Sequence, residues 1–332
     1  MNGIFQIIMT LAVAALVLGG CSSDPATAGI DRGGVTTPVV AQGPISGFGS
    51  IVVNGVHYGI DDAQIQVNGG PATAADLAIG QLVTVVGDRA QDGTTGNAAS
   101  VAFNANVTGP VQSLDAAAAT LVVLGQSVVT STATVFDLGN KPAEIASLQI
   151  GERVQISGFV GADGIIDATR IEARSPQSGL RLLGKVANLD RAAARFNINA
   201  LVVSYGAARL IDGFPGGEPT DADEVVVEGT VLGSNGELLA EELELNAPGF
   251  EREEGEEAEI EGLITRYVSA LDFDVAGLAT TTSAATEYEG GSAASLARNV
   301  KVKVEGRINV VGIIEARKIQ VKDGGRVVGE DD

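Results

Sequence analysis

The segment VTVVG (83–87) decides the fold, because close variants of it recur three times along the chain. The variants are VQISG (154–158), VVVEG (225–229) and VKVEG (302–306). In all four segments the first and third residues are apolar, which is typical of a strand with one face in a hydrophobic core. The terminal glycines recur at intervals of roughly 70 residues, as expected for a structural unit that repeats along the chain.

Hairpins are predicted on both sides of these strands. Those that precede them share a β-rich run, a two-residue turn and a second β-rich run: SIVVNGVHY (50–58), TLVVLGQSVV (120–129), RFNINALVVSY (195–205) and DFDVAGLATT (272–281). After the strands, Asp163-Gly164 and Asn235-Gly236 are typical turn pairs, because glycine tolerates a positive φ. DLAIGQ (76–81) and SLQIGE (147–152) predict a short helix or turn that covers one end of a small barrel.

The composition supports an all-β fold without large aromatic side chains. Aromatic residues make up 4% of the chain and tryptophan is absent, so the core must be built from Val, Ile, Leu and Ala. The 44 glycines fit many tight turns. We therefore predict tandem small antiparallel β-barrels of the OB-like type. The net charge of −21 repels phosphate backbones, so no nucleic-acid partner is expected.

The N-terminus resembles a bacterial lipoprotein signal. An apolar run (4–18) of the length of a signal-peptide core ends at Leu-Gly-Gly-Cys (18–21). This resemblance implies that Cys21 carries lipid and becomes the mature N-terminus, and Ser22 after it implies sorting to the outer membrane. The predicted location is the bacterial cell envelope, on the periplasmic or surface face. The alternatives are a buried structural cysteine and a simple secretory peptide.

The predicted domains follow from these features. They are a lipoprotein signal peptide (1–20), a flexible tether (21–42), β-barrel repeats at 43–108, 109–175 and 179–248, an acidic linker (249–259) and a fourth repeat (260–325). The segment EREEGEEAE (251–259) holds six Glu and one Arg, which favours a solvated linker over a dock for a cation or basic partner. We therefore expect the fourth repeat to fold independently from Ala258 onward.

Candidate chemistry is sparse. The glycines at 47 and 49 precede a hairpin that contains the glycine at 55, and no helix follows them, which excludes a phosphate-binding loop. His57 is the only histidine and is expected to face solvent, because no Cys or second His could complete a metal or catalytic set. The acidic clusters are Asp61-Asp62, Asp221/Asp223/Glu224 and Asp272/Asp274.

Of these clusters, Asp221, Asp223 and Glu224 are weak candidates for metal ligands, because Val225 stands where a calcium loop would place another oxygen ligand. We predict no catalytic residue and no cofactor. The expected function is a non-catalytic binding or scaffolding module with a protein or polysaccharide partner in the envelope. The alternative is a carbohydrate-active or other hydrolytic enzyme that uses Asp/Glu pairs.

The segment GPISGFGSIVVNGVHY (43–58), followed by DLAIGQLVTVVG (76–87), is similar to the opening of bacterial lipoproteins built from domain of unknown function 5666. The similarity is strong over 43–108 and extends by strand pattern over 109–175. Over 179–248 and 256–325 the Gly-Phe-Gly-Ser segment is missing. The resemblance implies tandem all-β barrels on an envelope lipoprotein, and it implies no catalytic residues.

Overall fold

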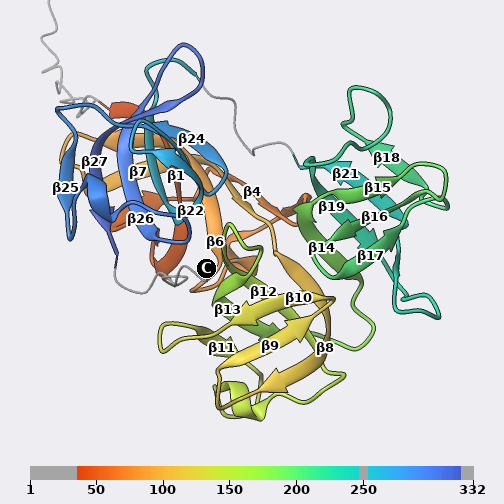
Figure 1. The fold of residues 1–332 in the computed structure, drawn as a ribbon. Helices are drawn as coiled ribbons and strands as arrows, with labels where there is room; N and C mark the ends of the chain where they lie inside the picture. The colour runs from red at the N-terminus through yellow and green to blue at the C-terminus, as the bar shows by residue number, and fades with distance from the viewer. Residues whose placement is uncertain (1–35, 247–252, 323–332) are drawn as a thin grey trace, which may run out of the picture. The chain divides into compact units, whose positions relative to one another are not determined.

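The computed structural model describes residues 36–246 and 253–322, all of which belong to one compact unit, Val35–Asp332. These residues form β-strands and three short 3-10 helices, and they contain no α-helix. The prediction of an all-β fold is therefore confirmed (Figure 1). No helix in this described part is long and apolar enough to cross a membrane.

The first repeat closes its strands into a ring. Its elements are β1 (Thr36–Gly47), β2 (Ile51–Val53), β3 (Val56–Gly59), β4 (Gln64–Val67), β5 (Gly70–Ala72), η1 (Ala74–Asp76), β6 (Leu82–Ala90) and β7 (Thr95–Phe103). Hydrogen bonds join β1 to β2, β2 to β3, β3 to β7, β7 to β6, and β6 back to β1. Because this series of pairings returns to β1, the sheet closes on itself and is barrel-like.

The second and fourth repeats have the same ring. The second contains β8 (Val107–Asp115), β9 (Thr120–Val123), β10 (Gln126–Val129), β11 (Val135–Asp137), η2 (Ile145–Ser147), β12 (Arg153–Val160) and β13 (Ile166–Ala173). The fourth contains β22 (Glu257–Ser269), β23 (Asp272–Val275), β24 (Leu278–Thr281), β25 (Glu287–Glu289), η3 (Ala293–Ser295), β26 (Lys301–Ile308) and β27 (Ile314–Val321). In both, the pairings reproduce those of the first repeat.

The third repeat keeps this order but interrupts two of its strands. It contains β14 (Leu180–Lys185), β15 (Ala187–Asp190), β16 (Arg195–Ile198), β17 (Leu201–Ser204), β18 (Leu210–Asp212), β19 (Glu224–Gly229), β20 (Leu238–Leu239) and β21 (Glu242–Leu245). The breaks between β14 and β15 and between β20 and β21 leave β15, β16, β17 and β20 as a separate four-stranded sheet.

The predicted antiparallel pairing is wrong for two pairs in each repeat. The short strand outside the ring runs parallel to the last strand, as β4–β7, β11–β13, β18–β21 and β25–β27 do. The third strand of the ring and its last strand run parallel, as β3–β7, β10–β13, β17–β20 and β24–β27 do. A two-residue turn can join only antiparallel neighbours, whereas a long crossover can bring a strand back in parallel. Here the crossover contains the short strand outside the ring (β4 in the first repeat) and the strand that holds VTVVG or a variant (β6 in the first repeat). Each repeat is therefore a mixed sheet.

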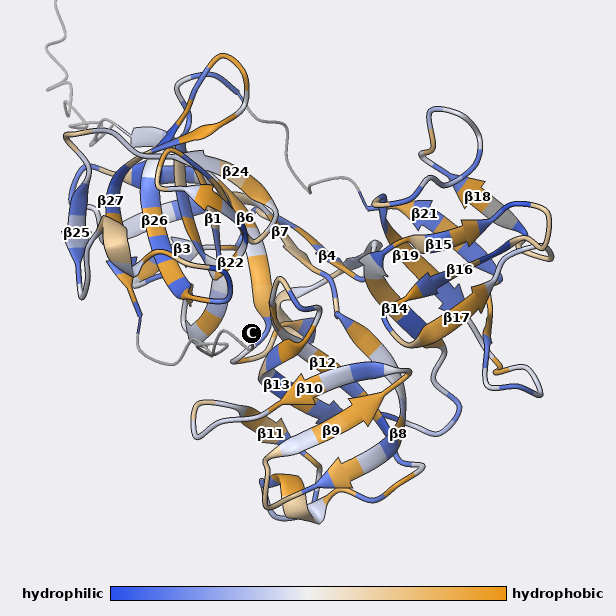
Figure 2. Cartoon of the chain, viewed as in Figure 1, coloured by the Kyte–Doolittle hydropathy of each residue, from blue (hydrophilic) through white to orange (hydrophobic). Residues whose placement is uncertain are grey.

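The period-two alternation and the end caps are confirmed. Val83 and Val85 of β6 are fully buried, as are their counterparts in β12, β19 and β26. The alternation of apolar and polar residues is clearest along β26 (Figure 2). After the 3-10 helices of the first, second and fourth repeats, the chain inserts Leu77, Leu148 and Leu296, all buried. They close the cores at the position where a covering turn was predicted.

The predicted hairpin turns are also confirmed. The first turn residues have φ of 55° at Asn54, 46° at Leu124, 49° at Asn199 and 50° at Ala276. In three of the turns the second residue is a glycine that also has positive φ, at positions 55, 125 and 277. Two successive positive φ values match the right-handed twist of the flanking strands. The sequence pattern therefore set both the position and the hand of these turns.

Each glycine that ends VTVVG or a variant lies where two strands approach closely. In the first, second and fourth repeats a β-bulge falls at this point, so that Gly87, Gly158 and Gly306 lie opposite Ala98, Ala168 and Ala316. A side chain on any of the three glycines would meet the backbone of the partner strand. Glycine is required here by close approach and not by an unusual φ.

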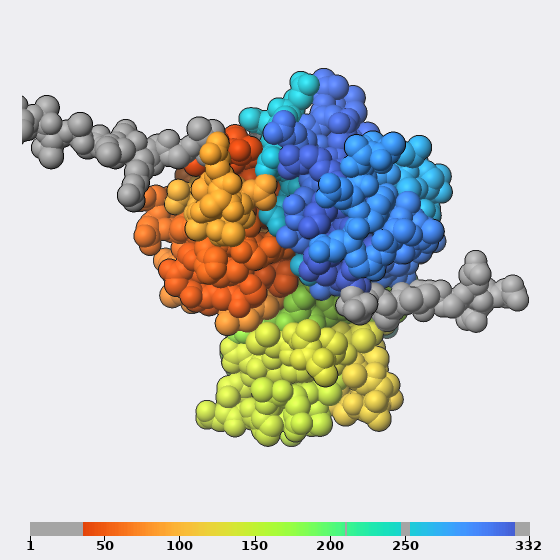
Figure 3. Space-filling model, turned by 90° about the vertical axis from the view of Figure 1, so that its left-hand side faces the viewer, coloured from red at the N-terminus to blue at the C-terminus, as the bar shows by residue number. Residues whose placement is uncertain are grey.

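The predicted tether and acidic linker are shorter than expected, because strands occupy part of each. Residues 36–42 lie in β1 and residues 257–259 lie in β22. The two strands pair in parallel, with Val39 opposite Glu257 and Gln42 opposite Ile260. The first and fourth repeats therefore share one 13-stranded sheet, and they meet in Figure 3 as orange and blue surfaces. Independent folding of the fourth repeat from Ala258 onward stays a prediction, and this pairing argues against it.

Candidate functional site

Cys21 and His57 were singled out from the sequence. Cys21 lies outside the described residues. His57 is exposed on β3, and its Nδ1 lies 3.2 Å from the Ser50 hydroxyl. The prediction that this histidine faces solvent is confirmed.

The three weak metal-ligand candidates serve separate local hydrogen bonds. Asp221 accepts the Leu189 N–H at 3.1 Å, and Asp223 accepts the Thr220 N–H at 2.7 Å. Glu224 accepts a hydrogen bond of 2.8 Å from the Asn246 side chain. Within the described ranges, no three His, Cys, Asp or Glu residues stand close enough together to hold a metal ion. The structure does not bring these carboxylates to one point.

The other acidic pairs lie at the surface. Arg266 binds Asp272 at 2.5 Å and Asp274 at 2.8 Å, and these hydrogen bonds hold the pKa of Asp272 below its ordinary value. Asp61 and Asp62 are exposed in a turn. Neither pair lines the two cavities described next. The arrangement of two carboxyls across a cleft, which glycoside hydrolysis needs, is therefore not met by these pairs.

The larger cavity, of about 460 Å³, lies where all four repeats meet, and we call it the junction cavity. Its most frequent polar groups are side-chain amides: Gln42, Asn104, Asn106, Gln126, Asn199 and Asn246. The fourth repeat contributes Leu263, Thr265 and Leu278. A pocket of this volume falls within the range of about 300–1,000 Å³ that is usual for small-molecule sites.

Two amides, the buried Gln126 and the exposed Asn199, hold the wall between the second and third repeats. Gln126 donates from Nε2 to the carbonyl oxygens of Leu124, at 2.9 Å, and Ile198, at 3.1 Å. Its Oε1 accepts a hydrogen bond of 2.6 Å from Asn199, which also donates to the Gly164 carbonyl. Gln126 is only 2% exposed, and both atoms of its side-chain amide are hydrogen-bonded, which stabilises this wall.

The contact between the second and fourth repeats is also polar. The Asn299 Oδ1 accepts the Ala162 N–H at 2.6 Å, and its Nδ2 lies 3.4 Å from Asp163. Close by, the Lys301 ammonium lies 4.4 Å from the centre of the Phe159 ring. Phe159 and Asp163 both line the junction cavity, so these contacts fix the distance between the two repeats at its edge.

Few charged groups line the junction cavity, and the acidic ones are engaged. They are Lys185, Asp163 and Glu224. Asp163 accepts the Ile165 N–H at 3.1 Å, and Glu224 is bound by Asn246. The cavity is thus close to neutral, in contrast to the strongly acidic chain.

A smaller cavity of about 350 Å³ is charged but internally compensated. Arg181 pairs with Glu228, and Arg209 binds Glu242 at 2.8 Å and Glu241 at 3.7 Å. Burial lowers the pKa of Arg181, with Glu228 opposing this shift. Because these cations already face carboxylates, this cavity offers no excess charge to a ligand.

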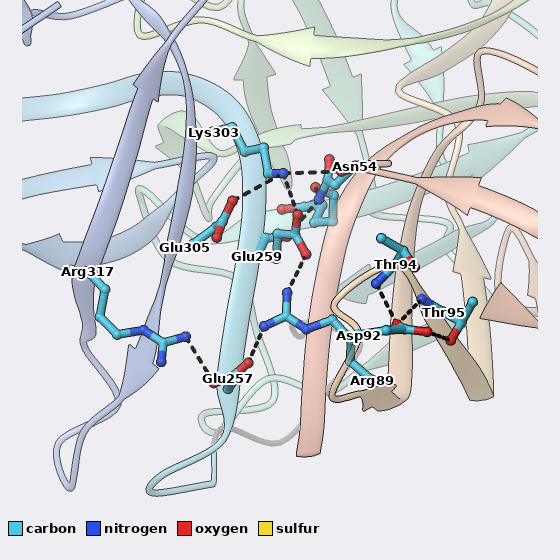
Figure 4. A network of polar contacts seen from close by, with 11 residues as sticks. Asn54, Arg89, Asp92, Thr94, Thr95, Glu257, Glu259, Lys303, Glu305 and Arg317 are labelled. Carbon is cyan, nitrogen blue, oxygen red and sulfur yellow. Dashed lines mark hydrogen bonds and ion pairs between the residues drawn. The ribbon is translucent and has the colours of Figure 1, made fainter. Parts of the chain in front are cut away.

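A buried charge network joins the first and fourth repeats (Figure 4). Arg89 of β6 reaches two carboxylates of β22: it pairs with Glu257 and lies 3.1 Å from Glu259. Lys303 of β26 binds Glu259 at 2.5 Å and donates to the Asn54 carbonyl at 3.1 Å. The Asn54 side chain in turn donates to the Glu259 carbonyl at 2.9 Å, so the hairpin turn of one repeat is tied to a strand of the other.

Burial and pairing compete within this network. Burial raises the pKa of Glu259, and its contacts with Lys303 and Arg89 only partly offset the effect. Burial alone would lower the pKa of Lys303, but Glu259 and Glu305 outweigh it and raise that pKa. For Glu257, burial is outweighed by Arg317, 2.9 Å away, and by Arg89, which together lower its pKa. Of the two carboxylates that Arg89 contacts, Glu259 therefore takes up a proton before Glu257.

The sequence analysis missed both the junction cavity and this network. The signal for the network was present in EAEIEGLI (257–264), where Ala258 and Ile260 alternate with acidic residues as they would in a half-buried strand. A second set of repeated glycines was also missed, at 43, 109, 184 and 262. Each lies under the hairpin of its own repeat, so that a side chain there would meet Asn54, Leu124, Ile198 or Ala276.

Comparison with known proteins agrees with the repeat structure. A search of curated proteins finds no match. The family model described as a domain of unknown function, DUF5666, matches residues 39–95, 108–172 and 261–320, which correspond to the first, second and fourth repeats. The third repeat, whose ring is interrupted, is not among the matched segments. Because the matched segments make up more than half of the chain, the protein belongs to the DUF5666 family, with that domain present in tandem.

Proposed function

We propose that the protein is a lipid-anchored, non-catalytic binding protein of the bacterial envelope, in which the four repeats together form one ligand site. The observation that supports this most directly is the junction cavity, to which every repeat contributes lining residues. Ligand sites are commonly found in concave pockets between structural units. A single repeat would supply only one wall, so the assembled chain is the functional unit.

We also propose that each repeat is a small barrel of the OB-like type. The order of five strands in the ring, with a 3-10 helix before the fourth, is the same in the first, second and fourth repeats. Five-stranded barrels of this kind bind ligands through one face and the adjoining loops. In this chain the loop Gly161–Gly164 of the second repeat and the turn Ala276–Gly277 of the fourth line the junction cavity.

Binding is favoured over hydrolysis by the state of the acidic side chains. A glycoside hydrolase needs one carboxyl with a raised pKa and a second that acts as base or nucleophile. At the junction cavity, Asp163 and Glu224 both accept hydrogen bonds from neighbouring N–H groups. The strongly buried Glu259 is bound by Lys303 and Arg89 instead of facing a substrate.

The anchor gives the first test of this proposal. We expect Cys21→Ser to abolish labelling by a palmitate analogue and to leave the protein uncleaved or soluble, because the lipid is attached through the cysteine sulfur. Ser22→Ala is the matched control and should retain full labelling. Labelling of the Cys21→Ser protein at the level of the parent would contradict the anchor.

The junction cavity gives the second test. A dialysable fraction of envelope extract is expected to raise the melting temperature of the parent chain, because a ligand that binds only the folded state stabilises it. Ala102→Phe places a large side chain in the cavity and should remove this rise. Ala99→Phe, an exposed residue on the same strand β7, should keep it. An equal rise in both variants, or none in the parent, would contradict ligand binding at this cavity.

A further inference from the structure

We propose that the junction cavity binds a neutral, polyhydroxylated ligand, such as a segment of an uncharged oligosaccharide. This inference rests on the proposed binding function and adds the chemical class of the ligand. Three features support it: the amide groups of the wall, the small number of available charges, and the lack of a long unpaired strand edge beside the cavity.

Amide side chains suit a ligand that both donates and accepts hydrogen bonds, as every sugar hydroxyl does. Some of this capacity is unused. Gln42 lines the junction cavity, and its Oε1 has no hydrogen-bond partner in the part of the chain that the structure describes. Asn106 is only 6% exposed, and its Oδ1 accepts the Gly158 N–H at 2.7 Å. The Asn106 Nδ2 makes no hydrogen bond to a described residue, which leaves a donor available beside the cavity.

The Gln42 Oε1 is a buried acceptor, and such a group is costly unless something satisfies it. An unsatisfied buried polar group costs about 1–3 kcal/mol, so a ligand hydroxyl that pairs with it gains correspondingly. The apolar part of the wall is aliphatic and includes Leu82, Leu183 and Leu263, which can contact the C–H faces of a sugar ring. The Phe159 ring already lies under Lys301, so aliphatic contacts have to replace the usual aromatic platform.

The charges argue against an acidic ligand. The carboxylates that line the cavity, Asp163 and Glu224, would repel an anion, and the whole chain carries a net charge of −21. Lys185 is the one cation among the lining residues, and it is exposed. A neutral ligand meets neither repulsion nor the cost of stripping water from a charge.

The strand pairing argues against an extended peptide. A peptide that adds to a sheet needs an unpaired strand edge. At Gln42, β1 lies between β6 and β22. The lining residues of β12 (158–160) and β14 (183–185) pair on one side only, with β13 and β19, so the open edges there are only three residues long. A small ligand held by side chains therefore fits the cavity better than a peptide.

The test uses an introduced tryptophan as a fluorescent reporter. Because the chain has no tryptophan of its own, the reporter is the only source of tryptophan emission. Val160 lines the cavity and is 39% exposed, so Val160→Trp places one indole at its edge. The probes are maltose, cellobiose and N,N′-diacetylchitobiose, with digalacturonic acid and trialanine for comparison. We expect a saturable change in emission with at least one neutral disaccharide, and none with the acid or the peptide. Val311→Trp, 71% exposed and outside the cavity lining, is the control reporter and should not respond.

A second variant tests the Asn106 donor. In the Val160→Trp background, Asn106→Asp keeps an acceptor for the Gly158 N–H but removes the amide hydrogens, so affinity should fall about tenfold. Its melting curve shows whether the fold is retained.

Binding of digalacturonic acid or trialanine in place of the sugars would overturn the ligand class. No response to any sugar, with the envelope fraction still stabilising the parent and not Ala102→Phe, would overturn the ligand class alone. Loss of that stabilisation as well would overturn the proposed function.

Discussion

Gly158→Ala is expected to lower the free energy of unfolding by about 3 kcal/mol, the upper end of the usual cost of overpacking a core. A Cβ atom at this position would lie 2.8 Å from Ile166 Cγ2 and 2.9 Å from Ala168 Cα, and closer still to the carbonyl oxygen of Asp167. Backbone atoms of a paired strand cannot move aside as a flexible side chain can. Equilibrium unfolding in urea, followed by far-ultraviolet circular dichroism, measures the change.

The matched control is Gly216→Ala. Gly216 is exposed, and a Cβ atom there would have no neighbour within 4 Å. The expected change is within about 0.5 kcal/mol, as for most surface substitutions. If Gly158→Ala unfolds at the same urea concentration as this control, the close approach of β12 and β13 at the bulge is not a constraint on the sequence.

The position of these glycines was predictable from the sequence, but their role was not. The strands before them were predicted correctly because the alternation of Val83 and Val85 is a local pattern with a period of two. The need for glycine arises from the opposite strand, at Asp167 and Ala168, and depends on a bulge in the register. Register is a property of two segments together, so a pattern read along one segment does not contain it.

The acidic segment shows how composition can hide a strand. Glu257 and Glu259 belong to a run of six Glu residues that favours a solvated linker. Their charges are compensated by Arg89 and Lys303, which lie far from them in the sequence. The compensation allows Glu259 to be only 3% exposed. Long-range pairing of charges thus outweighs the local preference of the run for solvent.

The junction cavity was unpredictable for a similar reason. Its amide side chains come from three different repeats, and none of them forms a motif with its sequence neighbours. Asn106, for example, follows the last strand of the first repeat and reaches Gly158 of the second. Single Asn and Gln residues on loops and strand ends are common, so only the packing of the repeats gives these ones a shared role.

Arg89→Met is expected to lower the free energy of unfolding by about 3 kcal/mol, because removing one partner of a buried ion pair typically costs about 3–5 kcal/mol. Arg89 bridges Glu257 and Glu259 from the other repeat, and its side chain is 17% exposed, which places the effect at the lower end of that range. Arg191→Met is the matched control. Arg191 lies 3.4 Å from Glu218 with both side chains more than half exposed, so its loss should cost no more than about 0.5 kcal/mol.

The loss caused by Arg89→Met should also depend on pH in a defined direction. Burial raises the pKa of Glu259 when the protein folds, so the folded state binds this proton more tightly than the unfolded state. The contribution of such a group is complete below the ordinary carboxyl pKa and is lost as the pH rises through the folded value.

Without Arg89 the pKa of Glu259 rises further, and the pKa of Glu257 is no longer held down by Arg89. Both changes make the charged carboxylates costlier at high pH, so the difference between variant and parent should be largest near about pH 8 and shrink toward about pH 5. Urea unfolding of both proteins across this range measures it, and a difference that stays constant or grows on acidification would show that Arg89 does not act through these carboxylates.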